Sequence, residues 1–238
     1  MTYDLLSVGA DAKTIKGNGD EYITAIQYMA SYKTVWEGKV HNLCAMAEKA
    51  KCHEACLVTA GRGQMSTVQA GRLRKAQMYI SDRKYYLTSL RKDLTTFVRR
   101  ANKNGQQPCV RLNGTTDIQF EKHGIFDEFP MVQFYDYTKI VKRAYAKLPS
   151  NYHLTLSYSE ANPDYAASVI KASVDTGTNM AVVFRDKALP TGFAGMPVIN
   201  GDKDDLRFLD PKGSVVALYA KGRAVRDTTG FVINNSIL

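Results

Sequence analysis

Six short β-prone runs in the second half of the chain constrain its fold more than any other feature. They begin at about residues 109, 131, 153, 180, 197 and 215 and read CVRLNG, MVQFYDY, HLTLSYS, MAVVF, PVING and VVALYA. Mostly apolar runs with little strict alternation are typical of strands covered on both faces, as in a parallel sheet. Two intervening segments, 137–149 and 162–177, have helical composition. Repeated units of this kind predict an α/β fold, either an open doubly wound sheet or a barrel, and we expect a partial (β/α) barrel-like parallel sheet.

Residues before about 105 show a helical periodicity instead. In 81–105 the apolar side chains follow the three-and-four spacing of an amphipathic helix. Ser81 or Asp82 can cap its start, and Asn104-Gly105 can end it. We therefore expect a mainly helical, cysteine-bearing part over 1–105 and the β/α strands over 106–238. The 238 residues are 45% hydrophobic and contain no long linker, so we expect one domain over 1–238.

The sequence also bears on the cellular compartment. No apolar run approaches the length of a membrane-spanning helix, and the first residues lack the basic and apolar regions of a signal peptide. We therefore expect a cytoplasmic protein without a membrane partner. In that reducing compartment thiols serve as ligands or nucleophiles more often than as disulfides.

Polar side chains follow five of the predicted strands, where parallel folds place their ligand sites. Turn chemistry alone also favours several of these residue types there. The candidates are Asn113 and Asp117 after the first strand, Tyr135 and Lys139 after the second, Ser157 and Glu160 after the third, and Arg185 after the fourth. In an enzyme, Glu160 or Asp117 is the candidate general base and Tyr135 a proton donor. Lys139 or Arg185 would bind an anionic group, while Asn113 and Ser157 would contact the substrate.

Three of the four cysteines lie within thirteen residues and precede the sequence TAGRG. Their spacing is C-x7-C-x3-C, formed by Cys44, Cys52 and Cys56. One interpretation is a buried helix seam, since cysteine packs as a small hydrophobe. A second is zinc, with Cys109, His41 or His53 completing the ligand set. A third is an iron–sulfur cluster on three thiolates, with Arg62 and the backbone of GRG near its sulfurs or a bound anion. A catalytic thiol fits less well, because one nucleophile needs no neighbouring cysteines.

The basic residues are concentrated in one segment, 62–103. It contains eleven lysines and arginines opposed only by Asp82 and Asp93, so it accounts for the net charge of +9. Such a segment attracts phosphate-bearing partners, although basic runs are also common on solvated helix faces.

A set of motifs gives the chain a family resemblance. They are SVGADAKTIKG, C…CHEACLVTAGRG, GRLRKAQMY…DR, VRLNGTTDI, FPMVQFYDYTK and LPSNYHLTLSYSEAN, spanning about residues 6–162. Their order is similar to that of the gene-product-88-like proteins of bacteriophages, which resemble radical S-adenosylmethionine enzymes distantly. The resemblance implies a [4Fe–4S] cluster on Cys44, Cys52 and Cys56 at the mouth of the partial barrel. The radical enzymes have a C-x3-C-x2-C triad and a glycine-rich methionine-binding signature, and this sequence departs from both. The resemblance therefore implies the cluster more directly than it implies S-adenosylmethionine.

Three functional hypotheses follow. The first is an enzyme whose open iron acts as a Lewis acid or one-electron donor toward a small or anionic ligand, in hydrolysis, elimination or radical chemistry. The alternative is a nucleic-acid-associated protein in which 62–103 contacts phosphates and interleaved tyrosines stack on bases. Its cluster, or zinc, would then be structural or redox-sensing. A third is a phage-encoded protein that binds a host factor without chemistry.

Overall fold

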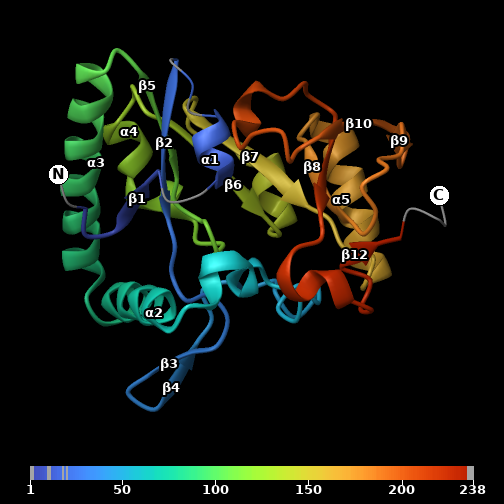
Figure 1. Ribbon diagram of the computed structural model, residues 1–238, viewed down its shortest axis with the longest axis horizontal. Helices are drawn as coiled ribbons and strands as arrows, with labels where there is room; N and C mark the ends of the chain where they lie inside the picture. The colour runs from blue at the N-terminus through green and yellow to red at the C-terminus, as the bar shows by residue number, and fades with distance from the viewer. Residues whose placement is uncertain (1–2, 10–11, 18, 20, 235–238) are drawn as a thin grey trace.

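The computed structural model describes residues 3–9, 12–17, 19 and 21–234, so two residues of the SVGADAKTIKG motif lie outside the described residues. Its main feature is a ten-stranded sheet in the order β1-β2-β5-β6-β7-β8-β11-β10-β9, with β12 pairing with β8 beside this path (Figure 1). Its strands are β1 (Leu6–Val8), β2 (Tyr22–Gln27), β5 (Gln107–Arg111), β6 (Gln133–Thr138), β7 (Tyr152–Ser157), β8 (Met180–Phe184), β9 (Gly192–Phe193), β10 (Met196–Asn200), β11 (Val215–Tyr219) and β12 (Val232–Ile233). A separate hairpin, β3 (Thr34–Trp36) and β4 (Lys39–His41), projects from one end of the molecule.

The six predicted strands are confirmed as β5, β6, β7, β8, β10 and β11. Their mutual pairings are all parallel, and among the described strands of this sheet the antiparallel pairs are β1–β2 and β9–β10 at its two ends. The register places Tyr135 of β6 beside His153 of β7. Because β1 and β9 end the sheet at opposite sides, it stays open and does not close into a barrel.

The helices confirm the predicted helix over 81–103 but not a mainly helical first half of the chain. They are α1 (Ala12–Gly17), α2 (Ser66–Ser81), α3 (Arg83–Lys103), α4 (Ile125–Glu128) and α5 (Pro163–Thr176). Short 3-10 turns are η1 (Leu57–Thr59), η2 (Gly61–Gln64), η3 (Phe120–His123), η4 (Val141–Tyr145), η5 (Arg207–Leu209) and η6 (Gly222–Arg226). The predicted helix 81–103 is α3, and the Asp82 carboxylate caps it by accepting from Tyr85 N. However, β1 to β4 precede α2, so the first 105 residues are not mainly helical. Strand β2 lies between β1 and β5 and buries most of its side chains, so it is an interior strand of the sheet.

Of the two predicted crossover helices, one forms and the other does not. Segment 162–177 forms α5, which Asn162 caps and Gly177 ends with a φ of 69°. Segment 137–149 contains only the 3-10 turn η4. Its first two residues end β6, the Asp117 carboxylate accepts from Lys139 N just before η4, and Pro149 lies at its other end. Tertiary hydrogen bonding therefore overrides its helical composition.

Cys44, Cys52 and Cys56 do not lie on a helix. Residues 45–55 form a series of turns, which excludes the helix-seam interpretation. Backbone hydrogen bonds from Ala47 to Cys44 and from Ala50 to Met46 compact these turns.

The core consists of two clusters. One lies between β2, β5, β6 and the helices α2 and α3, and the other joins β7, β8 and β11 to α5 and the cysteine turns. In Figure 1, α3 runs along one side of the sheet and α5 lies at the other. Within the described ranges, no helix has the length and apolarity needed to cross a bilayer.

Candidate functional site

The cysteine turns, residues 44–56, lie across the carboxyl ends of the parallel strands. Asp117 N, beyond β5, donates to Leu43 O at 2.9 Å, and Ser159 Oγ, beyond β7, donates to Ala50 O at 2.8 Å. Figure 1 shows this segment along the edge of the sheet, close to the η6–β12 region. The thiols therefore lie at the sheet edge where a ligand site was expected.

The three thiols are close enough to interact electrostatically. Burial raises the pKa of Cys44 to about 12, and the charges of Cys52 and Cys56 raise it as well. Burial also raises the pKa of Cys52, with a further contribution from Cys56. The Cys52 Sγ donates weakly to Ala47 O at 3.8 Å. In the absence of a ligand, Cys44 and Cys52 are therefore neutral thiols at pH 7.

Lys139 lies beside these thiols. Its Nζ donates to Ser157 Oγ at 2.9 Å and sits 5.6 Å from the centroid of the Phe231 ring. A hydrogen bond from Lys139 lowers the pKa of Cys52, against the larger effect of burial. Burial lowers the pKa of Lys139, whereas Cys52 and Cys44, when they are thiolates, raise it above its ordinary value. Two predicted residues, Lys139 and Ser157, therefore join the cysteines.

A second cation, Arg72, approaches the site from α2. Its side chain is buried, its Nη1 donates to Val58 O at 3.3 Å, and its guanidinium lies over the Tyr28 ring. Burial lowers the pKa of Arg72, whereas Tyr28 and Cys56 act in the opposite direction. Within the described chain, Arg72 Nε has no hydrogen-bond partner.

The GRG sequence contributes a glycine to this site rather than its arginine. A Cβ on Gly63 would lie 2.7 Å from Val58 O and 3.1 Å from Arg72 Nη1, so the close packing of Arg72 requires glycine there. The Arg62 side chain is exposed on η2. The sequence did not distinguish Arg72 from its basic neighbours, and only its burial does.

The remaining metal-ligand candidates lie in three places: Cys109 in β5, His41 in β4 and His53 within the cysteine turns. Cys109 is buried in β5, and burial and the charge of Glu21 raise its pKa to about 12. His53 Nδ1 lies 3.0 Å from Ala47 O, and His41 lies in β4. Among the described residues, no three His, Cys, Asp or Glu side chains are arranged to hold one metal ion.

Glu160 and Arg185 line a neighbouring pocket of about 440 Å³. Its other lining residues are Arg226, Asp227, Thr228, Gly230, Val232 and Asn234. Partial burial raises the pKa of Glu160. Arg185 donates to Asn234 Oδ1, Val225 O and Asp227 O, so it supports the pocket wall. The segment Gly230–Phe231 links the two sites, because Gly230 lines the pocket and Phe231 contacts Lys139.

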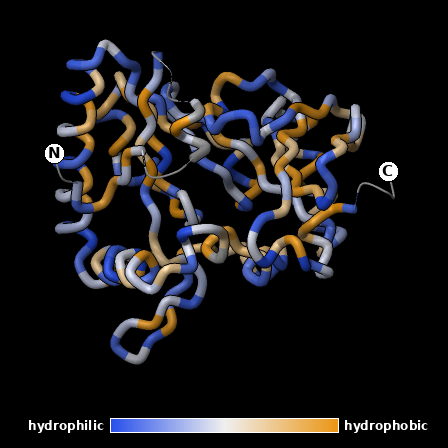
Figure 2. Tube along the Cα trace, viewed as in Figure 1, coloured by the Kyte–Doolittle hydropathy of each residue, from blue (hydrophilic) through white to orange (hydrophobic). Residues whose placement is uncertain are grey.

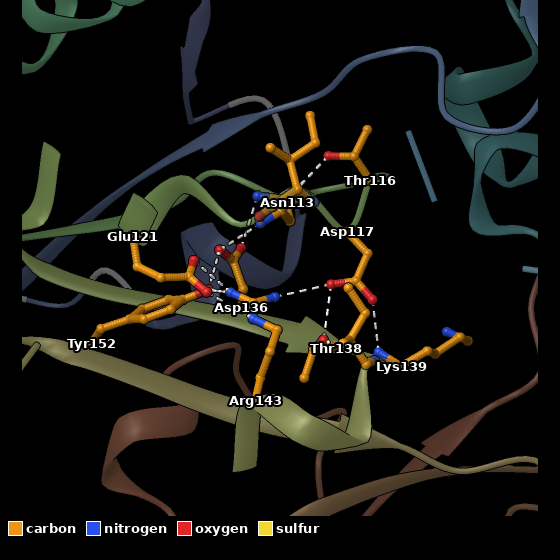
Figure 3. Close-up of polar contacts among 11 residues, drawn as sticks. Asn113, Thr116, Asp117, Glu121, Asp136, Thr138, Lys139, Arg143 and Tyr152 are labelled. Atoms are coloured by element: carbon orange, nitrogen blue, oxygen red, sulfur yellow. Dashed lines mark hydrogen bonds and ion pairs between the residues drawn. The ribbon is translucent and has the colours of Figure 1, made fainter. Parts of the chain in front are cut away.

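Asn113 and Asp117 belong to a buried polar network between β6 and the loop after β5 (Figure 3). Asp117 accepts from Thr138 Oγ1, Lys139 N and Arg143 Nη1, each within 2.9 Å. Asn113 donates through its backbone and side chain to Asp136 at 2.7 and 2.9 Å. These hydrogen bonds connect the network to Lys139 and so position the end of β6.

Arg143 is the cation of this network. It donates to Asp117 at 2.9 Å, to Glu121 at 2.9 and 3.0 Å, and to the Tyr152 hydroxyl at 2.7 Å. Tyr152 in turn donates to Asp136 Oδ2 at 3.1 Å. The sequence pointed to Asp136 as one of the polar residues at a strand end, but Arg143 and Tyr152 were not expected, because no local motif marks side chains that meet across three elements.

Tyr135 lies on the face of the sheet opposite to that of Asp136 and its polar network. It is buried, and its hydroxyl donates to Asp205 Oδ2 at 3.2 Å. Successive side chains of a strand point to opposite faces, so Tyr135 and Asp136 cannot share one site. The structure therefore separates Tyr135 from Lys139 and Glu160.

The chain matches one known protein family over almost its whole length. The model of the family described as gene product 88 matches residues 4–235, almost the whole chain. The chain belongs to the gene product 88 family. No curated protein and no solved structure matches it. The family membership predicted from the motifs is thus confirmed, while the likeness to radical S-adenosylmethionine enzymes stays a prediction.

The raised pKa of Asp136 makes the stability of this gene product 88 family member depend on pH. Burial raises its pKa from 3.8 to about 6, although Asn113 acts to lower it. Between these values the folded chain binds more protons than the unfolded chain, so the contribution of Asp136 to the free energy of unfolding decreases as pH rises through this window. The decrease is up to about 3 kcal/mol, and the contribution is constant above the folded pKa.

Urea unfolding from about pH 4 to about pH 7 measures this contribution. The Asp136→Asn variant is expected to lack it, so the difference in stability between wild type and variant should change across the window. Parallel pH profiles for the two proteins would contradict the shifted pKa.

Proposed function

We propose that this gene product 88 family member is an iron–sulfur protein. It would bind a [4Fe–4S] cluster on Cys44, Cys52 and Cys56, leave one iron open, and act on a small or anionic ligand at the strand ends. The observation that carries the proposal is the gathering of three interacting thiols between Lys139 and Arg72.

The donor set suits a cluster better than a single metal ion. Three thiolates can each bind a different iron of a cubane, so their sulfurs stand farther apart than ligands that share one ion. This distinction agrees with thiols that interact electrostatically without forming a single-ion site in the described residues. Cys109 lies apart from the other thiols, which leaves three protein ligands for four irons.

The charges beside the three thiols also favour an iron–sulfur cluster. Lys139 and Arg72 form no ion pair in the described part of the chain, and Asp117, whose charge acts on Lys139, pairs with Arg143 instead. Cations held away from carboxylates are costly unless another anion compensates them. The neutral thiols do not compensate them, whereas thiolates bound to a cluster would. Lys139 would then serve as an outer partner of the cluster sulfurs, and such partners tune potential and affinity.

The neighbouring residues define what a ligand would meet. A bound cluster supplies Lewis acidity or one-electron transfer at its open iron. Glu160, whose pKa is raised by partial burial, is the group in the adjacent pocket that can hold or release a proton. Arg226, which is exposed and lines the same pocket, is placed to meet an anionic group. Binding of S-adenosylmethionine at the open iron is a further part of the proposal and comes from the distant resemblance alone.

Metal and sulfide analysis of protein purified without oxygen tests the proposal. We expect about four irons and four sulfides per chain, with a broad absorption band at about 400 nm. Air exposure should bleach the band and release iron. Zinc alone, or protein without metal after anaerobic iron–sulfur reconstitution, would contradict the proposal.

A further inference from the structure

The outer face of α3 has a charge distribution that the cluster site does not explain. At about 100° and 1.5 Å per residue, Lys84, Lys92, Arg99 and Lys103 fall within an arc of about 100° and span about 28 Å. All four side chains are exposed. Figure 2 shows hydrophilic residues along this outer side. We call this set the α3 basic stripe.

Acidic residues near the stripe do not neutralise it. The sole acid within α3, Asp93, is buried and accepts from the backbone N–H groups of Asp4, Leu5 and Leu6. Asp82 caps the helix. Glu128 pairs with Arg91, which lies beside the stripe. Among the described residues, the four stripe side chains form no ion pair with a carboxylate. The solvated face of a helix usually carries both acidic and basic residues, and oppositely charged side chains four residues apart stabilise it. The stripe carries basic residues without such acidic partners.

The aromatic residues indicate which kind of polyanion fits. The sequence predicted tyrosines interleaved with the basic residues, ready to stack on bases. In the structure Tyr79 and Tyr86 are buried, with ring centroids 5.1 Å apart, and only Tyr85 of the three is exposed. A stacking surface for single strands is therefore missing from this face. What it offers instead is a straight row of cations nearly as long as one turn of a duplex.

From these observations we infer that the α3 basic stripe binds double-stranded nucleic acid through the phosphate backbone. The threonines between the cations, Thr88 and Thr95, donate their hydroxyls to helix carbonyls and present no base-reading group. Binding is therefore independent of sequence and dependent on salt, because phosphate contacts release counterions. This binding is independent of the proposed cluster.

Fluorescence anisotropy with a labelled DNA duplex of about 20 base pairs tests this inference, with salt varied from about 50 to about 300 mM. Four phosphate contacts predict a slope of about −3 to −4 in log affinity against log salt. The triple variant Lys84→Gln, Lys92→Gln, Arg99→Gln is expected to lose about 2.7 of that slope and at least about tenfold in affinity.

A matched control removes three exposed lysines from the β8–β11 half of the molecule: Lys187→Gln, Lys203→Gln and Lys212→Gln. It changes the net charge equally and is expected to bind nearly as wild type does. Equal loss in both triple variants would overturn the inference, because total charge and not the stripe would then be responsible. Tighter binding to a single strand of the same length, or to vesicles containing phosphatidylglycerol, would also overturn it.

Discussion

Replacing Arg143 with methionine is expected to lower the free energy of unfolding by about 3–5 kcal/mol, because it breaks a buried ion pair by removing one partner. The Arg143 side chain is 3% exposed, and it neutralises Asp117 and Glu121, which are 3% and 12% exposed. Methionine fills similar space and leaves both carboxylates without their cation. The Tyr152 hydroxyl loses a donor as well.

Urea unfolding of wild type and Arg143→Met measures this loss. Lys171→Met is the matched control, since Lys171 pairs with Asp175 at 2.7 Å but is 72% exposed. An exposed pair of this kind contributes little to stability, because water and salt screen both charges. If the two variants lose similar stability, the buried network does not stabilise the fold as argued.

Replacing Cys52 with serine is expected to abolish the proposed cluster almost completely. A hydroxyl does not replace a thiolate on iron, and two remaining cysteines leave two irons without a protein ligand. Absorbance at about 400 nm and iron content should both fall to background after identical anaerobic purification. Retention of the band in Cys52→Ser would show that Cys52 is not a ligand.

Two variants control for folding and position. Cys109→Ser removes a thiol that lies away from the site and should keep its iron. Glu160→Gln alters the neighbouring pocket without touching a proposed ligand, and the protein should stay coloured. A colourless Glu160→Gln protein would place Glu160 at the cluster rather than in the pocket.

Local patterns in the sequence predicted the elements of the fold well. The apolar runs at 131 and 153 became β6 and β7, and Asp82 caps α3 as its side chain type suggests. Such features depend on a few neighbouring residues, so they can be recognised one segment at a time. Segment 137–149 shows the limit, because its helical composition was overridden by a hydrogen bond to Asp117, which is distant in the sequence.

The candidate site was predicted in part. Lys139 and Ser157 do meet beside the cysteines, since the carboxyl ends of parallel neighbours share one sheet edge. Tyr135 was assigned to the same edge, but the side-chain alternation of β6 directs it to the other face. Arg62 stood next to the cysteines in sequence, whereas Arg72 reaches them through the packing of α2 over Gly63.

The amino-acid sequence alone determined the parallel strands, the amphipathic α3 and the concentration of cysteines and basic residues, because periodicity, capping and composition are local properties. Only the tertiary structure decided which charges are paired, which cations remain exposed on α3, and which arginine stands at the thiols. Those outcomes depend on burial and on contacts between segments far apart in the sequence, such as Asp93 with Leu5 and, 109 residues apart, Ser159 with Ala50. Desolvation makes such contacts energetically decisive, and it acts only once the chain has folded.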